Sequence, residues 1–209
     1  GANMTAICIY HGNCADGFGA AWAVRHRFRR DENPIEFHAG IYQNPPPDVM
    51  RGEETQIAGL LHRYPAFEGV ACLPGTHTKW AEIANGAVNS FQTFMTGELF
   101  DLLSRQSVLR HGMGGDGWSA SAFADGVEQA LGDPAGIAGA LFPLRAASLV
   151  ATQDPAEARA RLSGLLIGQE LAASRTRWQG RPVTIVGGDR IAEAYEAALA
   201  IAGCNAGKT

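Results

Sequence analysis

Residues 70–93 constrain the fold more than any other part of the sequence. They contain three short runs that are rich in apolar and β-forming residues: 70–73, 80–84 and 87–93. Asn85-Gly86 joins the last two runs and is a strong hairpin signal, because a type I′ turn needs left-handed backbone at both of its central positions. We therefore expect three strands, with residues 74–79 as a tight loop between the first two and a hairpin joining the last two.

Strands and helices alternate along the rest of the chain, which indicates an α/β protein. Further strands are predicted at 6–10, 35–42 and 183–186. Helices are predicted across 18–28, 53–62, 119–131 and 156–174. Another helix is predicted to begin with Thr96 as its N-cap, and the last helix is predicted to end at Gly203. The first two strands and their helix form a β-α-β unit with a parallel crossover. Three prolines at 45–47 favour extended chain and end the second strand, so we expect one domain over residues 1–48 and another over 49–209.

Composition excludes several classes of protein. The 209 residues are 46% hydrophobic and 18% charged, which is typical of a globular chain rather than a disordered one. The net charge is −4, and only one short Arg-rich run occurs, so we expect no nucleic-acid partner. No apolar run of 18 residues is present, so we expect no membrane span. Four cysteines without CxxC spacing indicate reduced thiols in a cytoplasmic protein.

The loop at 75–79 has the residue types of a phosphate site. Gly75 allows backbone N–H groups to approach an anion closely. Thr76 and Thr78 add hydroxyl donors, and Lys79 adds a cation. A tight turn with a solvated lysine has the same pattern, and a single histidine such as His77 is more often structural than catalytic.

Two other segments carry candidate functional residues. A strand that ends in Gly187-Gly188 before a helix resembles an adenosine or phosphate site, although a short β-α turn has the same form. Arg51 beside Glu53 and Glu54 could bind a hydroxylated acid and supply a base. The alternative is a charged helix N-terminus, where glutamate is favoured by the helix dipole.

Residues 49–209 resemble the 2-dehydro-3-deoxygalactonokinase family. The matching words are VMRGEETQIAG (49–59), CLPGTHTKW (72–80), FQTFMTGELFDLLSRQSVL (91–109), FADGVEQAL (123–131), LSGLLIGQELA (162–172) and VTIVGGDRIAEAYEAALAIAGC (183–204). The resemblance implies a ribonuclease-H-like lobe of the actin-like ATPase superfamily. It also implies ATP and Mg²⁺ as cofactors and a sugar acid, 2-dehydro-3-deoxy-D-galactonate, as the acceptor.

The resemblance also implies roles for particular residues. Residues 75–79 become a phosphate loop, and Gly187-Gly188 become the loop on the adenosine side. Glu53 or Glu54 is expected near the acceptor hydroxyl as the catalytic group. Substrate-binding residues are expected to be Arg51, Thr96 and Glu98. The family's first phosphate loop, Asp-x-Gly-Thr/Ser-Thr, does not occur in this sequence, so we expect little turnover from this chain alone.

Residues 4–49 resemble instead the start of a DHH-type phosphoesterase, through ICIYHGNCADGFGAAWAVRH (7–26) and IEFHAGIYQNPPPDV (35–49). In that family Asp16 would bind a metal such as Mn²⁺, with His11 beside it. The family's later aspartate and Asp-His-His motifs do not occur here, so a two-metal site cannot be completed. The alternatives to a kinase are therefore a metal-dependent phosphoesterase or a non-catalytic nucleotide-binding remnant. The sequence leaves the oligomeric state open, although the exposed surface of a half-domain would favour self-association into a homo-oligomer.

Overall fold

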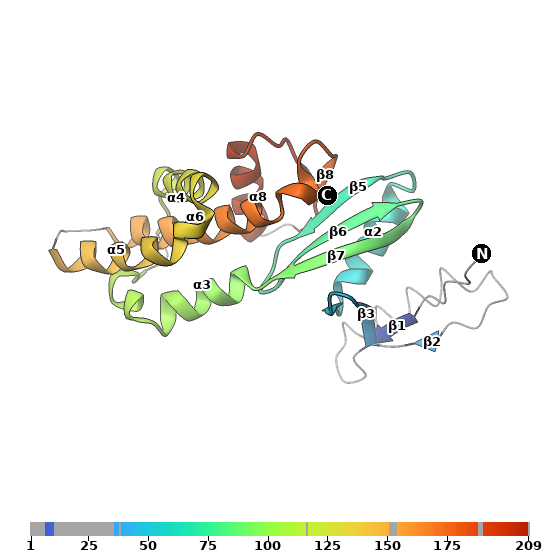
Figure 1. The fold of residues 1–209 in the computed structure, drawn as a ribbon, viewed down its shortest axis with the longest axis horizontal. Helices are drawn as coiled ribbons and strands as arrows, with labels where there is room; N and C mark the ends of the chain where they lie inside the picture. Colours follow the sequence, from blue (N-terminus) through green and yellow to red (C-terminus); the bar gives the residue numbers. More distant parts are fainter. Residues whose placement is uncertain are drawn as a thin grey trace.

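The computed structural model describes residues 7–10, 36–37, 39–115, 117–150, 154–187 and 190–208. Figure 1 shows a central sheet with a group of helices at one end and a smaller sheet at the other. Within the described residues, no helix is long and apolar enough to cross a membrane.

The central sheet has five strands in the order β7-β6-β5-β8-β9. They are β5 (Gly69–Leu73), β6 (Thr78–Ala84), β7 (Ala87–Phe94), β8 (Val183–Ile185) and β9 (Gly207–Lys208). β6 runs antiparallel to both of its neighbours, whereas β8 is parallel to β5 and β9 is parallel to β8. Three antiparallel strands followed by two parallel ones give the ribonuclease-H-like α/β lobe that we expected.

The predicted hairpin turn is confirmed. Asn85 has φ 55° and Gly86 has φ 71°, so both central residues are left-handed, as a type I′ turn requires. β6 and β7 pair on either side of this turn, from Ala84 opposite Ala87 outward. Local turn chemistry therefore sets the register of the sheet edge.

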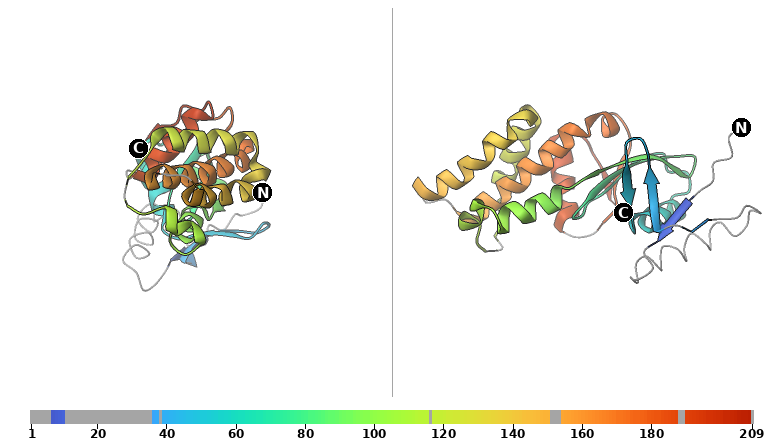
Figure 2. Two further views of the ribbon diagram at one scale, coloured as in Figure 1. Left: turned by 90° about the vertical axis from the view of Figure 1, so that its left-hand side faces the viewer. Right: turned by 60° about the horizontal axis from the view of Figure 1, so that its bottom comes forward.

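The two faces of the central sheet are covered by different helices. Side chains alternate along a strand, so neighbours on β5 face opposite ways. Ala71 and Leu73 pack in one cluster with α2 (Glu53–Arg63), whereas Val70 and Cys72 pack in another with α6 (Pro155–Ala173) and α8 (Arg190–Ile201). Figure 2 shows the helices α4 (Ala120–Gly132) and α6 side by side at the end of the sheet. The sheet is buried on both faces, which fixes the loops at its edge.

Helices α4 and α6 approach each other through glycines. A Cβ placed on Gly164 would lie 2.2 Å from the carbonyl oxygen of Phe123, and one on Gly126 would lie 2.6 Å from that of Arg161. Only residues without a side chain allow the two backbones to come this close. α6 begins as predicted, with the Asp154 carboxylate accepting from the Ala156 N–H at 2.9 Å and Pro155 in the first turn.

Four helical elements were not anticipated from the sequence. They are η1 (Val108–Gly112), η2 (Pro134–Gly136), α5 (Ile137–Val150) and α7 (Arg175–Trp178). α5 contains Pro143 and leaves Phe142, Leu149 and Val150 exposed, so its apolar residues do not form a single inward stripe. The short strands β4 (Asp48–Met50) and β9 were also missed, because two or three residues carry no readable pattern.

The segment at 35–42 differs from the continuous strand that we predicted. It is divided into β2 (Glu36–Phe37) and β3 (Ala39–Gln43). β1 (Ile7–Tyr10) pairs parallel with β2, as a β-α-β unit requires, but pairs antiparallel with β3. The predicted helix at 18–28 lies outside the described residues.

The proline segment forms a turn and not the extended chain that we predicted. Residues 44–47 connect β3 to β4 (Asp48–Met50), and the two strands pair antiparallel. The carboxylate of Asp48 then accepts from Thr93 N at 2.7 Å and from Thr93 Oγ1 at 2.6 Å, which attaches the hairpin to β7. The predicted boundary after Asp48 falls inside this hairpin, and the division at that point stays a proposal.

Candidate functional site

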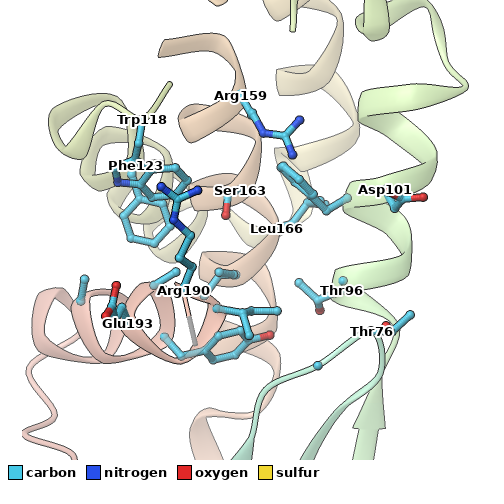
Figure 3. A pocket seen from close by; sticks show the side chains of 18 of the residues that line it. Thr76, Thr96, Asp101, Trp118, Phe123, Arg159, Ser163, Leu166, Arg190 and Glu193 are labelled. Carbon is cyan, nitrogen blue, oxygen red and sulfur yellow. The ribbon is translucent and has the colours of Figure 1, made fainter. Parts of the chain in front are cut away.

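A cavity of about 1020 Å³ lies beside the loop that follows β5. Its walls come from α3 (Thr96–Arg105), α4, α6 and α8, and Gly75 and Thr76 line it from the loop (Figure 3). Ligand sites for small molecules and cofactors are typically about 300–1,000 Å³. The cavity is therefore large enough for a nucleotide.

Arginine and aromatic side chains line the part of the cavity away from the loop. In Figure 3 the side chain of Arg190 extends from α8 toward Trp118 and Phe123. The guanidinium of Arg159, on α6, lies 4.9 Å from the centre of the Phe100 ring on α3. This combination of apolar rings and cations suits a ligand with both a flat ring and negative charge.

Sheet topology brings the two predicted glycine loops to the same edge. β5 and β8 are adjacent and parallel, and the N–H of Val186 donates to the carbonyl of Cys72 at 2.8 Å. Carboxyl ends of parallel strands meet at one edge, so the loops that follow them start side by side. Gly75 lines the cavity, and so does Arg190 just after the second loop. Gly187 is not among the lining residues, and Gly188 lies outside the described residues.

The start of α3 rests directly on the first loop. A Cβ on Gly97 would lie 2.4 Å from the carbonyl oxygen of Gly75 and 2.8 Å from Thr76 Cα, so only glycine fits there. The N–H of Glu98 donates to the carbonyl of Thr76 at 3.0 Å. The conformation of the loop thus depends on the position of α3.

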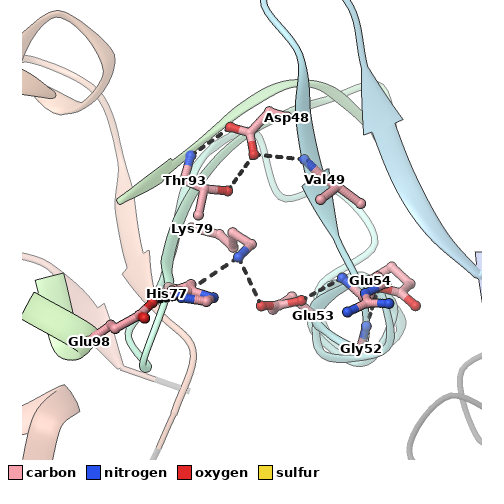
Figure 4. A network of polar contacts seen from close by, with 10 residues as sticks. Asp48, Val49, Gly52, Glu53, Glu54, His77, Lys79, Thr93 and Glu98 are labelled. Atoms are coloured by element: carbon pink, nitrogen blue, oxygen red, sulfur yellow. Dashed lines mark hydrogen bonds and ion pairs between the residues drawn. The ribbon is translucent and has the colours of Figure 1, made fainter. Parts of the chain in front are cut away.

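Five of the predicted site residues form a polar cluster, shown in Figure 4. Lys79 is 4% exposed, and its ammonium lies 3.3 Å from Glu53 Oε1 and 3.3 Å from the carbonyl oxygen of His77. His77 Nε2 lies 2.5 Å from Glu98 Oε2, and Glu53 Oε2 accepts from the N–H of Arg51 at 2.9 Å. Residues far apart in the sequence therefore connect α2, the loop and α3.

Of the other predicted polar residues, Thr76 is exposed at the cavity, whereas Glu54, Thr78 and Thr96 are buried. Glu54 is buried, its carboxylate accepts from the N–H of Gly52 at 2.7 Å, and burial raises its pKa. Thr78 is fully buried, with its hydroxyl 2.8 Å from that of Tyr195. The prediction that the Thr96 side chain caps α3 is wrong. α3 begins at Thr96 after Met95, and the Thr96 hydroxyl donates to Glu170, although Thr96 also lines the cavity.

Sequence reasoning missed the arginines and Trp118. A signal existed for Arg190, because a basic residue in the first turn of a helix is disfavoured by the dipole and needs another reason to be there. Arg159 and Trp118 carry no local signal, since tertiary packing alone brings their elements to the cavity.

The predicted metal residues His11 and Asp16 lie outside the described residues. Among the residues that are described, no group of three or more His, Cys, Asp or Glu could hold a metal ion. Cys72 and Cys204 are free thiols.

The fold and cavity define the class of protein as a ribonuclease-H-like lobe with a nucleotide-sized site at its sheet edge. The family model "2-keto-3-deoxy-galactonokinase" matches residues 15–209, and the chain belongs to this family. The match includes Asp16 and most of the segment that resembles a phosphoesterase. The comparisons do not support that second resemblance.

Two curated relatives and one solved structure agree with this assignment. The chain is 41% identical to a protein of Rhizobium meliloti (strain 1021) named as a probable 2-dehydro-3-deoxygalactonokinase, DgoK1, over 163 residues. It is 38% identical to the 2-dehydro-3-deoxygalactonokinase of Escherichia coli (strain K12) over 159 residues. Each match covers 76% of this chain and 53% of the relative.

A crystal structure described as a 2-dehydro-3-deoxygalactonokinase protein from Sinorhizobium meliloti matches with a TM-score of 0.77 and 38% identity. This match covers 84% of the present chain and 60% of the other. The chain therefore spans little more than half the length of the relatives that it matches.

Proposed function

We propose that this chain forms part of an enzyme that transfers the γ-phosphoryl group of ATP to a hydroxyl of 2-dehydro-3-deoxy-D-galactonate. The family match over residues 15–209 carries this proposal. The geometry supports it, because the loop at Gly75 and the start of α8 lie at one edge of the sheet beside a nucleotide-sized cavity.

In this proposal the loop after β5 binds the phosphates. Backbone N–H groups of Gly75, Thr76 and His77 would donate to the anion. A Cβ on Gly75 would meet nothing closer than 3.9 Å, so the space beside this residue is open to a ligand. Thr78 and Lys79 are buried and act from the base of the loop. Phosphoryl transfer depends mainly on such positioning and on charge neutralisation.

The adenosine half of ATP is assigned to the far end of the cavity. Gly187 and Gly188 would let the nucleotide approach the sheet edge. Arg190 and Trp118 would contact the base, because arginine and aromatic faces both stack on flat rings. Mg²⁺ bound together with ATP would supply further neutralisation of the phosphate charge.

The acceptor sugar acid is assigned to the side of the loop that carries Glu53. Of the two candidate bases, Glu54 is buried and accepts from the Gly52 N–H at the start of α2, whereas Glu53 is partly exposed beside Lys79. We therefore assign the proton-accepting role to Glu53, a role that contributes about 10²–10⁴-fold to a rate. Arg51, Thr96 and Glu98 are assigned to substrate binding near it.

Two further properties belong to this proposal. The free thiols of Cys72 and Cys204 support a reducing compartment such as the cytoplasm. Self-association is proposed because α3 leaves Leu99 and Leu102 exposed, and sedimentation equilibrium tests it.

Calorimetric titration with Mg-ATP, followed by a coupled kinase assay with 2-dehydro-3-deoxy-D-galactonate, tests the proposed activity. We expect ATP to bind and Gly75→Val to abolish binding, because the new side chain fills space that the phosphates need. Gly132→Val is the matched control, since a Cβ there meets nothing and the residue does not line the cavity. ATP affinity that Gly75→Val leaves unchanged would contradict the assigned site.

We also propose that turnover by the 209 residues alone stays below about 1 s⁻¹, the lower end of typical enzyme rates. The sequence contains no Asp-x-Gly-Thr/Ser-Thr word to hold the phosphates from the opposite side. Aligning donor and acceptor can be worth about 7–11 kcal/mol of the barrier. ATP binding without transfer is the expected result, and faster transfer would show that other residues replace this loop.

A further inference from the structure

The carboxyl of Glu170 on α6 is buried without a cationic partner. It is 2% exposed, and no Lys, Arg or His among the described residues forms an ion pair with it. Burial raises its pKa, in spite of the hydrogen bonds that it accepts. Burying a carboxyl costs free energy, and hydrogen bonds from neighbouring donors offset that cost.

Three donors from three different elements meet at this carboxyl. Trp80 Nε1 on β6 donates to Oε1 at 2.7 Å. The Tyr195 hydroxyl on α8 donates to Oε2 at 2.7 Å, and the Thr96 hydroxyl at the start of α3 donates to the same oxygen. The Tyr195 hydroxyl is also 2.8 Å from that of Thr78, the first residue of β6. One side chain of α6 thus connects the sheet with two other helices.

These donors lie next to the residues assigned to the phosphates. Thr96 at the start of α3 and Tyr195 on α8 both line the cavity. Thr96 precedes Gly97, which contacts the loop at Gly75, and Thr78 directly follows that loop. A shift of the Glu170 carboxyl would move α3 and the end of the loop together.

We propose that Glu170 is a positioning residue for the nucleotide site. By accepting from Thr96 and Tyr195, it holds α3 and α8 at the separation at which the Gly75 loop binds phosphates. This inference rests on the proposed function for its ligand. Glu170 acts through Thr96 and Tyr195 and does not line the cavity itself.

A double-mutant cycle on ATP binding tests the proposal. Glu170→Gln keeps the side-chain shape but replaces one acceptor oxygen by a donor, and Thr96→Val removes the hydroxyl. Each change is expected to weaken the calorimetric Kd for Mg-ATP about tenfold, which corresponds to 1.4 kcal/mol. The double variant is expected to lose no more than Glu170→Gln alone, because the Thr96 hydroxyl acts through the Glu170 carboxyl. Losses that multiply would overturn the proposal.

Ser174→Ala is the matched control. The Ser174 hydroxyl is fully buried and donates to the backbone carbonyl of Glu170 at 2.8 Å, so its loss weakens the same part of α6 without altering the carboxyl. We expect unchanged ATP affinity in this variant, and an additive result when it is combined with Thr96→Val. A tenfold loss of affinity in Ser174→Ala would reduce Glu170 to a general structural role.

Hydrogen exchange of the Glu98 amide, which donates to Thr76, gives a readout that does not depend on ATP. Glu170→Gln and Thr96→Val are expected to speed this exchange at least about tenfold, while Ser174→Ala leaves it unchanged. Unchanged exchange in both variants would overturn the positioning role. If Glu170→Gln does not fold, Thr96→Val alone decides the outcome. If the wild-type chain does not bind ATP, the proposed function fails, and the exchange data still test the role of Glu170.

Discussion

Lys79 and Glu53 form an ion pair across the junction of β6 and α2, with the ammonium nitrogen 3.3 Å from Glu53 Oε1. The two partners differ in environment, because the Lys79 side chain is 5% exposed and that of Glu53 is 24% exposed. Water can therefore reach the carboxylate more easily than the ammonium. The cost of breaking the pair should depend on which partner is removed.

Glu53→Gln is expected to destabilise the protein by about 1–3 kcal/mol, because the neutral amide leaves a buried ammonium without an anionic partner. Lys79→Met is expected to cost less, since the exposed side of Glu53 can be rehydrated. Urea unfolding of both variants and of the double variant measures this asymmetry. A larger loss in Lys79→Met than in Glu53→Gln would contradict it.

Glu170 should make part of the stability depend on pH. Its pKa is raised by burial above the ordinary value of 4.5, so the folded state holds the proton more tightly than the unfolded state. This contribution is fully present below pH 4.5 and is lost as pH rises through the folded pKa. The stability of the wild type relative to Glu170→Gln is therefore expected to fall as pH increases from 4.5.

Unfolding by urea at a series of pH values, with the two proteins compared at each pH, measures this effect. The titratable groups that interact with Glu170 are Tyr195 and Cys72, and burial raises the pKa of both, so they stay neutral in this range. Trp80 and Thr96 contact the carboxyl but do not titrate. A difference that grows with pH would show that Glu170 is stabilised as an anion.

Gly164→Ala should strongly destabilise the contact between α4 and α6. The new Cβ would lie 2.2 Å from the Phe123 carbonyl oxygen, so the helices must separate, at a cost of about 1–3 kcal/mol. Gly139→Ala on α5 is the control, since its Cβ meets nothing within 4 Å. That variant is expected to gain about 0.5–1 kcal/mol from helix propensity. Thermal unfolding compares the two, and equal effects would refute the close contact.

Arg190→Met should weaken ATP binding about tenfold, which corresponds to 1.4 kcal/mol. Arg190 lines the cavity, and no described residue forms an ion pair with it. Arg175→Met on α7 serves as the control, because Arg175 is exposed and does not line the cavity. Calorimetric titration with Mg-ATP gives both affinities. If Arg190→Met and Arg175→Met bind Mg-ATP with equal affinity, Arg190 does not contribute to the nucleotide site.

Many of the elements and the family resemblance could be read from the sequence, because their signals are local. The Asn85-Gly86 turn, the Asp154 cap of α6 and the strand before Gly187 each depend on residues within a few positions of one another. The family words lie in the same order along the chain and needed no structure to be recognised. The predicted Thr96 cap failed because a distant residue competes with the local signal. The Thr96 hydroxyl donates to Glu170, which lies 74 positions away in the sequence.

The sequence by itself determined the three strands between residues 70 and 93, their Asn85-Gly86 turn, the start of α6 and the family. Only the tertiary structure decided which polar residues share a site. It joined Glu53 to Lys79, buried Thr78 against Tyr195, placed Arg190 at the cavity, and gathered three donors around Glu170. The physical reason is that turns and caps arise from neighbouring residues, whereas burial and hydrogen-bond partners depend on which distant elements pack together.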